Sequence, residues 1–152
     1  MPEEAAKASP KAPQVVLAFD LGRRRIGVAC GDTVSRSASP LGAVSAAAGG
    51  PRWEDIGSLL SEWQPALLVV GLPYNADGSE STAAAEARNF ARELGERYAL
   101  PVELVDERYS SLEAGARLKG ARASGLRRRR VAKSDVDAGA ACVILERWLG
   151  VL

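Results

Sequence analysis

The stretch QVVLAFDLGRRRIGVACGD, residues 14–32, decides the fold. Its first part, Gln14–Asp20, is a β-rich apolar run that ends in an acid, and it predicts a buried strand. After a short Leu-Gly turn, Arg25–Gly31 predicts a second strand of the same kind. Strands joined by so short a connection pair antiparallel. The fold is therefore expected to begin with a hairpin whose first strand carries Asp20 near its end.

Working outward from this hairpin, the patterning predicts an alternation of strands and helices. The expected elements are a strand over Ser37–Ser45, a helix over Pro51–Trp63, a strand over Ala66–Gly71, a helix over about Ser81–Tyr98, a strand over Leu100–Val105, a helix from Ser110 to about Lys119, a basic loop over Gly120–Lys133 and a final helix over Lys133–Leu149. A three-stranded meander followed by strand–helix–strand crossovers predicts an α/β protein with a mixed five-stranded sheet flanked by helices on both faces. That order fits the ribonuclease-H-like fold.

The composition predicts one domain. The chain has 152 residues, of which 47% are hydrophobic, which suits a single core. We expect residues 1–13, rich in Ala, Pro, Lys and Glu, to form a disordered tail and residues 14–152 to form the domain. The sequence contains no run of about 18 apolar residues, so no membrane span is expected. Cys30 and Cys142 lack metal-ligand spacing and are expected to be buried thiols of a cytoplasmic protein.

The chain contains no histidine. This absence excludes Ser-His and Cys-His nucleophilic pairs, two-histidine phosphodiester chemistry and histidine zinc sites. If the protein is an enzyme, carboxylates are its expected reactive groups.

Two of the candidate acids follow predicted strands. Asp20 ends the first strand, where it either initiates a turn or acts as a metal ligand held by the sheet. Asp106 and Glu107 follow the last strand, where they are either surface acids or, in the case of Glu107, a second ligand. The loops after parallel strands gather at one edge of an open sheet, where ligands bind. Asp20 and Glu107 are therefore expected near one another.

The third candidate is Asp137 in the final helix. Apolar residues follow it at spacings of 3, 4, 7, 8, 11 and 12, which places Asp137 on the stripe that faces the core. A buried carboxylate needs a cation or a set of donors, although Asp137 also fits a helix capping box with Ser134. Asp135 points about 200° away on an ideal helix and is the weaker ligand candidate. Clustered acids repel one another, and Mg²⁺ or Mn²⁺ would remove that conflict and serve phosphodiester hydrolysis.

Four blocks resemble the YqgF family, which is also called RuvX. They are AFDLGRRRIGVACGD at residues 18–32, LLVVGLPYNADGS at 67–79, LVDERYSSLEA at 104–114 and KSDVDAGAACVILERWL at 133–149. Members of this family are assigned as Holliday junction resolvases and as nucleases for the 5′ end of pre-16S ribosomal RNA. The resemblance implies the ribonuclease-H-like fold, a homodimer in many members, and divalent-metal catalysis by Asp20, Glu107 and Asp137. The family usually has Thr-Lys or Ser-Lys where this chain has Arg23-Arg24, and Ser-Thr where it has Ser110-Ser111.

A basic segment leads into the final helix. Its cations are Lys119, Arg122, Arg127, Arg128, Arg129, Arg130 and Lys133, without an acid among them. The segment is either a solvated loop or a phosphate-binding surface beside the site, and its position before Asp137 favours the second interpretation. Arg23, Arg24 and Arg25 add positive charge after Asp20. By resemblance, the loop with Asn75 lines the substrate site, although its residues are also ordinary turn formers.

Three hypotheses about function follow. The first is a metal-dependent endonuclease on branched DNA, with four-way junctions ranked ahead of precursor ribosomal RNA as the substrate. The second is an actin-like nucleotide-binding protein, because Asp20-Leu21-Gly22 also fits a phosphate loop, but such proteins need two domains of this kind. The third is a binding module that does not cut, against which the intact acids argue.

Overall fold

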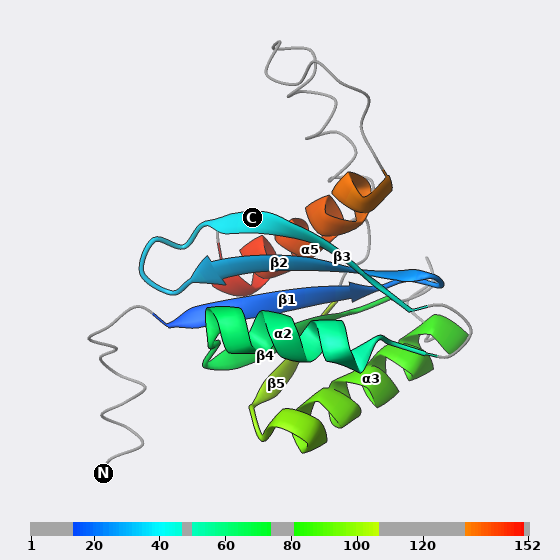
Figure 1. Ribbon diagram of the computed structural model, residues 1–152. Helices are drawn as coiled ribbons and strands as arrows, with labels where there is room; N and C mark the ends of the chain where they lie inside the picture. The colour runs from blue at the N-terminus through cyan, green and yellow to red at the C-terminus, as the bar shows by residue number, and fades with distance from the viewer. Residues whose placement is uncertain (1–13, 47–49, 74–80, 107–132, 151–152) are drawn as a thin grey trace.

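The computed structural model describes residues 14–46, 50–73, 81–106 and 133–150 (Figure 1). The strands are β1 (Val15–Leu21), β2 (Arg25–Asp32), β3 (Ala38–Ser45), β4 (Leu67–Leu72) and β5 (Val102–Asp106), and the helices are α2 (Trp53–Trp63), α3 (Thr82–Tyr98) and α5 (Lys133–Leu149). The tail over residues 1–13, the helix expected from Ser110 and most of the basic loop lie outside the described residues. No helix in the described ranges is long and apolar enough to cross a membrane.

The five strands form one mixed sheet in the order β3-β2-β1-β4-β5. β1 pairs antiparallel with β2 and parallel with β4, β3 pairs antiparallel with β2, and β5 pairs parallel with β4. The predicted mixed sheet is confirmed. β5 begins at Val102, two residues later than expected, because Ala99 ends α3 in a left-handed conformation (φ 54°) and Pro101 has no N–H to donate to a ladder.

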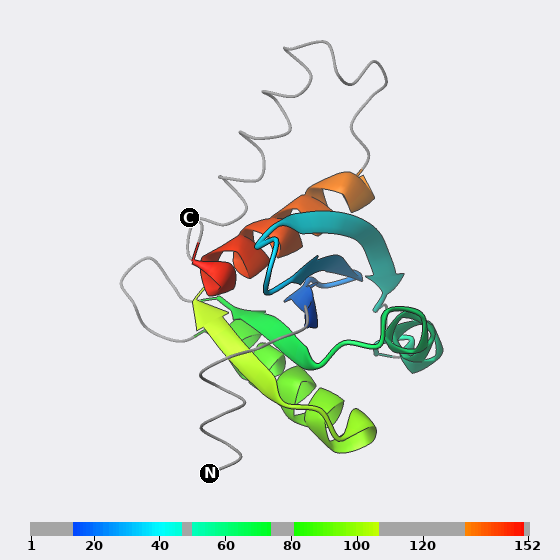
Figure 2. The same cartoon turned by 90° about the vertical axis from the view of Figure 1, so that its left-hand side faces the viewer.

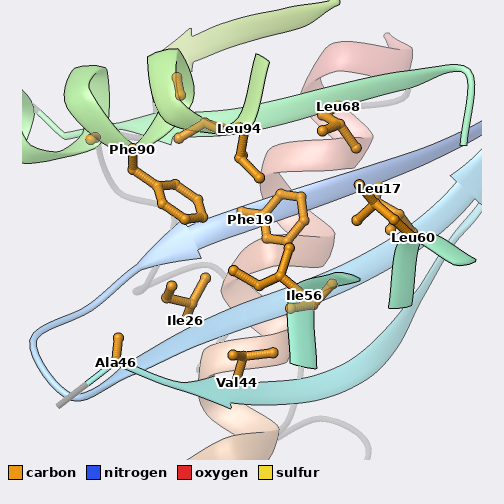
Figure 3. Close-up of a cluster of buried hydrophobic side chains, with 14 of the residues drawn as sticks. Leu17, Phe19, Ile26, Val44, Ala46, Ile56, Leu60, Leu68, Phe90 and Leu94 are labelled. Carbon is orange, nitrogen blue, oxygen red and sulfur yellow. The ribbon is translucent and has the colours of Figure 1, made fainter. Parts of the chain in front are cut away.

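Helices cover both faces of the sheet, as predicted (Figure 2). Side chains alternate between the two faces along a strand, and Val16 to Phe19 of β1 are all fully buried. Leu17 and Phe19 belong to the cluster under α2 and α3, whereas Val16 and Ala18 belong to the cluster under α5. Figure 3 shows Phe19 among side chains of α2 and α3. Because both faces of β1 are buried, its residues before Asp20 do not alternate between apolar and polar.

An aromatic stack joins α2 to α3. The Trp53 ring stacks on Phe90, with centroids 5.6 Å apart, and the Arg97 guanidinium lies 4.1 Å above the centroid of Trp53. The Tyr98 hydroxyl donates to the Trp53 carbonyl at 3.3 Å. At the other end of α3, the Ser81 side chain caps the helix by accepting from the Ala84 N–H. The contacts of Trp53 with Phe90, Arg97 and Tyr98 hold the first turn of α2 against α3.

The last turn of α5 is anchored at three points. The Arg36 guanidinium donates to the Leu149 carbonyl from Nε at 3.1 Å and from Nη2 at 2.7 Å. On the other side, Trp148 Nε1 donates to Glu103 Oε1 at 2.9 Å and Arg147 Nη1 donates to the Asp106 carbonyl at 3.2 Å. The C-terminal end of α5 is therefore held between the β2–β3 turn and β5.

Candidate active site

Three strand ends meet at one edge of the sheet. β1, β4 and β5 run parallel, with Phe19 opposite Val70 and Leu72 opposite Asp106. Asp20, half-buried, is the last residue but one of β1. Its carboxylate therefore lies at the edge where open α/β sheets bind their ligands, as the sequence predicts.

Asp20 lies on the face of the sheet that α5 covers. Val16 and Ala18 precede it by four and two residues, and both pack in the cluster under α5. Because alternate residues of a strand share a face, the Asp20 side chain lies on the same face as Val16 and Ala18. The next residue, Leu21, packs against the cluster under α2 and α3. The end of β1 thus presents an acid on one face and an apolar side chain on the other.

Asp106 lies on the opposite face from Asp20. Val105 packs against the α5 cluster, and Val102 packs against the α2–α3 cluster. Alternation along β5 therefore places Asp106 with Val102, away from the carboxylate of Asp20. Glu107, the residue that the sequence predicts as the ligand, lies outside the described residues.

The backbone of α5 brings the third acid towards the same edge. The Arg36–Leu149 contact holds the C-terminal end of α5 at the β2–β3 turn, which lies beside the start of β1 because Val15 pairs with Asp32. A helix of 17 residues extends for about 25 Å, and Figure 1 shows its N-terminal end on the side of the β1 arrowhead. Asp135 and Asp137 lie in the first turns of this helix, within the part whose side chains are not described.

The predicted apolar stripe of α5 is confirmed in large part. Ala141, Ile144 and Leu145 are fully buried against the sheet, and Leu149 is nearly so. Ala140, which the stripe also included, instead forms a separate buried cluster with Val143. The buried surface of α5 is therefore broader than one stripe, and the place of the Asp137 side chain stays a prediction.

Of the predicted basic residues, three are described. Arg23 and Arg24 are exposed in the turn after β1, and Arg25 is half-buried at the start of β2. The turn is closed by a hydrogen bond from the Gly22 N–H to the Arg25 carbonyl at 2.9 Å, and Ala46 N donates to the Arg24 carbonyl at 2.7 Å. The remaining candidates, Asn75, Lys119, Arg122 and Arg127–Arg130, lie outside the described residues, as does the side chain of Lys133.

The acid Asp32, which ends the first resembling block, has a local structural role. Its Oδ1 accepts from the Val34 and Ser35 N–H groups, and its Oδ2 accepts from the Ser35 hydroxyl at 2.8 Å. The hydrogen bonds from Ser35 lower the pKa of Asp32. Asp32 pairs with Val15 at the far end of the sheet from Asp20, so it stabilises the β2–β3 turn.

Among the residues that the structure describes, no three acids, cysteines or histidines are grouped as metal ligands. Glu107 and the side chain of Asp137 fall outside that set, so the three-acid cluster stays a prediction. The buried thiols behave as expected: Cys30 and Cys142 are both free and buried, and burial raises the pKa of Cys30.

The sequence profile of the RuvX family, described as Holliday junction resolvase, matches residues 14–150. The chain belongs to this family. A relative from Xanthomonas campestris pv. campestris (strain 8004) is 49% identical over 146 residues, 96% of this chain and 92% of its own. A relative from Legionella pneumophila (strain Paris) is 47% identical over 135 residues, 89% of this chain and 94% of its own. Both carry the name "Putative pre-16S rRNA nuclease". This RuvX chain is thus a nuclease, as the sequence predicts.

Solved structures support the fold of the RuvX chain. T. thermophilus RuvC in complex with a Holliday junction substrate aligns with a TM-score of 0.54 at 16% identity, over 90% of this chain and 96% of that one. The yeast mitochondrial Holliday junction resolvase Ydc2 aligns with a TM-score of 0.51 at 12% identity, over 93% and 80%. The ribonuclease-H-like fold is therefore confirmed.

A half-open cavity next to this edge was not predicted from the sequence. It lies between the turn after β1 and α3, and Glu86, Asn89 and Glu93 of α3 line it together with Arg23. The available signal was the helical spacing of these polar residues around Phe90. That spacing is common on solvated helix faces, so it carried no prediction without the tertiary structure.

Proposed function

We propose that this RuvX chain is a divalent-metal-dependent endonuclease that processes the 5′ end of pre-16S rRNA. The names of relatives nearly half identical over almost the whole chain favour this substrate. The sequence alone favours four-way DNA junctions as the substrate. Four-way junctions are supported only by the family description and by folds at 16% identity or less. We therefore prefer the precursor RNA as the substrate.

The observation that carries the proposal is the position of Asp20. It lies at the end of a central strand, on the face covered by α5, and β5 ends at the same edge with Asp106, the residue that precedes Glu107 in the sequence. Asp20, Glu107 and Asp137 would together hold Mg²⁺ or Mn²⁺, with Asp135 as a further candidate. Their oxygens are the hard ligands that these ions prefer, and the chain has no histidine to attract a softer metal. Such ions stabilise the charge that develops on a phosphodiester during hydrolysis.

The surroundings of Asp20 suit a polyanion. Arg23 and Arg24 are exposed three and four residues after Asp20, so a phosphate on this turn lies close to the acid. The proposed RNA surface continues through Arg25, Asn75 and the basic segment from Lys119 to Lys133. Arginine contacts to phosphate position a strand without reading its sequence, which suits a substrate recognised by its fold.

The test compares two aspartate-to-asparagine variants. A transcript that carries the 5′ leader of pre-16S rRNA is incubated with wild-type protein, Asp20→Asn or Asp55→Asn, in Mg²⁺ or Mn²⁺. Asp55 is a surface acid of α2 that pairs with Arg52 at 3.2 Å, so it controls for the change of charge. We expect Asp20→Asn to lower cleavage by about 100-fold or more while RNA binding persists. Asp55→Asn should cleave as the wild type does.

The other outcomes separate the alternatives. Cleavage by Asp20→Asn at the wild-type rate would refute the assignment of the site. Cleavage of a labelled four-way DNA junction in preference to the transcript would restore the ranking made from sequence. Binding of either polymer without metal-dependent cleavage by the wild type would favour the binding module.

A further inference from the structure

A cavity of about 590 Å³ lies behind the turn that follows Asp20. Its walls come from the β1–β2 turn, from the chain after β3, and from one face of α3. Figure 3 shows two of its lining residues, Phe90 and Ala46, at the end of the sheet where β1 passes into β2. The volume falls within the range of small-molecule sites, about 300–1,000 Å³. We name this cavity the α3 pocket.

The α3 pocket and the Asp20 carboxylate lie on opposite faces of the same strand end. Leu21 lines the pocket, whereas Asp20 precedes it and faces α5. Arg23, which also lines the pocket, is three residues beyond Asp20, so their Cα atoms are at most about 11 Å apart. A strand held at Asp20 can therefore cross the turn and place a neighbouring nucleotide over the pocket.

The charges that line the pocket exclude a phosphate from its α3 wall. Within the described part of the chain, neither Glu86 nor Glu93 forms a salt bridge. Two arginines of the same helix are engaged elsewhere: Arg92 pairs with Glu96 at 3.4 Å, and Arg97 lies over Trp53. Two uncompensated carboxylates repel an anion. Arg23, on the opposite wall, is the group that suits a phosphate at the rim.

The polar groups of the α3 wall match one nucleobase edge. Carboxylates only accept hydrogen bonds, so Glu86 and Glu93 require donors from the ligand. The Asn89 Oδ1 accepts from Arg92 at 3.4 Å, which leaves the Asn89 amide nitrogen to donate. The wall therefore offers a donor beside acceptors. Guanine presents two adjacent donor groups, N1–H and N2–H, beside an acceptor at O6, so it can satisfy both oxygens of one carboxylate as well as the Asn89 amide. Uracil, cytosine and adenine each present a single donor group beside an acceptor and leave one carboxylate oxygen without a donor.

We propose that the α3 pocket binds one unpaired guanine of the RNA strand that is cut, with Glu86 or Glu93 accepting from N1–H and N2–H and Asn89 donating to O6. The proposal rests on the nuclease function proposed above and adds a preference for sequence next to the cut. The half-buried side chain of Leu21 lines the same cavity and offers an apolar surface to the flat base. Single-stranded RNA is commonly read in this way, by bases that leave the stack and enter pockets.

The test uses a precursor RNA whose nucleotides around the cut are randomised, with the products sequenced. We expect wild-type protein to enrich guanine at one position, with a rate about 5- to 150-fold above that for uracil there. The variant Glu86→Gln/Glu93→Gln replaces the proposed acceptors by amides, so the guanine enrichment should disappear and the rate at guanine should fall to the rate at uracil. Glu96→Gln is the matched control on the same helix and should keep the enrichment.

Two results would overturn the proposal: a flat profile for the wild type, or an enrichment that Glu86→Gln/Glu93→Gln leaves intact. Either would leave the nuclease function standing, because cleavage itself is observed. If no RNA is cut, the nuclease function fails, and the pocket is judged by binding alone. Fluorescence anisotropy with short RNAs that contain guanine, inosine or uracil then decides. Preference for guanine over inosine, lost in the double variant, supports the pocket, and equal affinities refute it.

Discussion

The turn after Asp20 offers a direct test of how the site is positioned. At Gly22, an added Cβ would lie 2.7 Å from the Arg25 carbonyl oxygen, closer than such atoms approach in proteins. That oxygen also accepts the Gly22 N–H at 2.9 Å. Gly22→Ala must therefore open the turn and weaken this hydrogen bond. Because the turn is exposed and can relax, we expect a cost of about 1–3 kcal/mol.

The matched control makes the same substitution where space is available. At Gly57 in α2, an added Cβ would lie 3.5 Å from the Tyr98 hydroxyl, an ordinary contact. Alanine stabilises a helix interior by about 0.5–1 kcal/mol relative to glycine. For a chain of this length, 1 kcal/mol shifts the melting temperature by about 2–4 °C. Gly22→Ala should thus melt about 2–12 °C below the wild type, and Gly57→Ala about 1–4 °C above it.

Thermal melts followed by far-UV circular dichroism measure these shifts, and cleavage is then assayed well below all three melting temperatures. We expect Gly22→Ala to lose about tenfold or more in rate, because Asp20 lies two residues away and small displacements of catalytic groups are costly. Gly57→Ala should cleave normally. A Gly22→Ala protein that melts with the wild type would refute the steric argument. A lower melting temperature with full activity would show that Asp20 is held independently of the turn.

Two further predictions concern the far end of the sheet. Arg36→Ala removes both hydrogen bonds to the Leu149 carbonyl and should lower the free energy of unfolding in urea by about 1–3 kcal/mol. The control Arg52→Ala breaks only exposed ion pairs and should cost less than about 1 kcal/mol; equal losses would contradict the anchoring role of Arg36. Because the folded state lowers the pKa of Asp32 below its ordinary value of 3.8, Asp32 stabilises the fold at neutral pH and loses that effect as the pH falls below 3.8. The gap in melting temperature between wild type and Asp32→Ala should therefore close in acid, and a gap that stays constant with pH would exclude this linkage.

The predictable part of the fold lies in elements with one dominant pattern. β1 was recognisable because its residues before Asp20 are all apolar and buried on both faces. The stripe of α5 was recognisable because Ala141, Ile144 and Leu145 repeat at helical spacing. Element ends were less accurate, as at β5, where the left-handed Ala99 ends the preceding helix.

The candidate site likewise has one part that the sequence predicts and one part that depends on tertiary contacts. Asp20 followed from a strand ending in an acid, and family resemblance selected it together with Glu107 and Asp137. Sequence alone did not separate Asp106 from Glu107, because both follow the same strand. Val102 and Val105 pack in different clusters, which places Asp106 on the face of the sheet opposite to Asp20. This assignment requires knowing which helix covers each face.

The amino-acid sequence by itself determined the order of strands and helices, the chemistry open to a chain without histidine, and the family. These depend on local periodicity and on residue identity, which short segments carry. Only the tertiary structure decided that β1 lies at the centre of the sheet, that α5 covers the face of Asp20, and that the turn after β1 and α3 border the α3 pocket. Those features depend on contacts between segments distant in the chain, which form only when the apolar faces of sheet and helices are buried together.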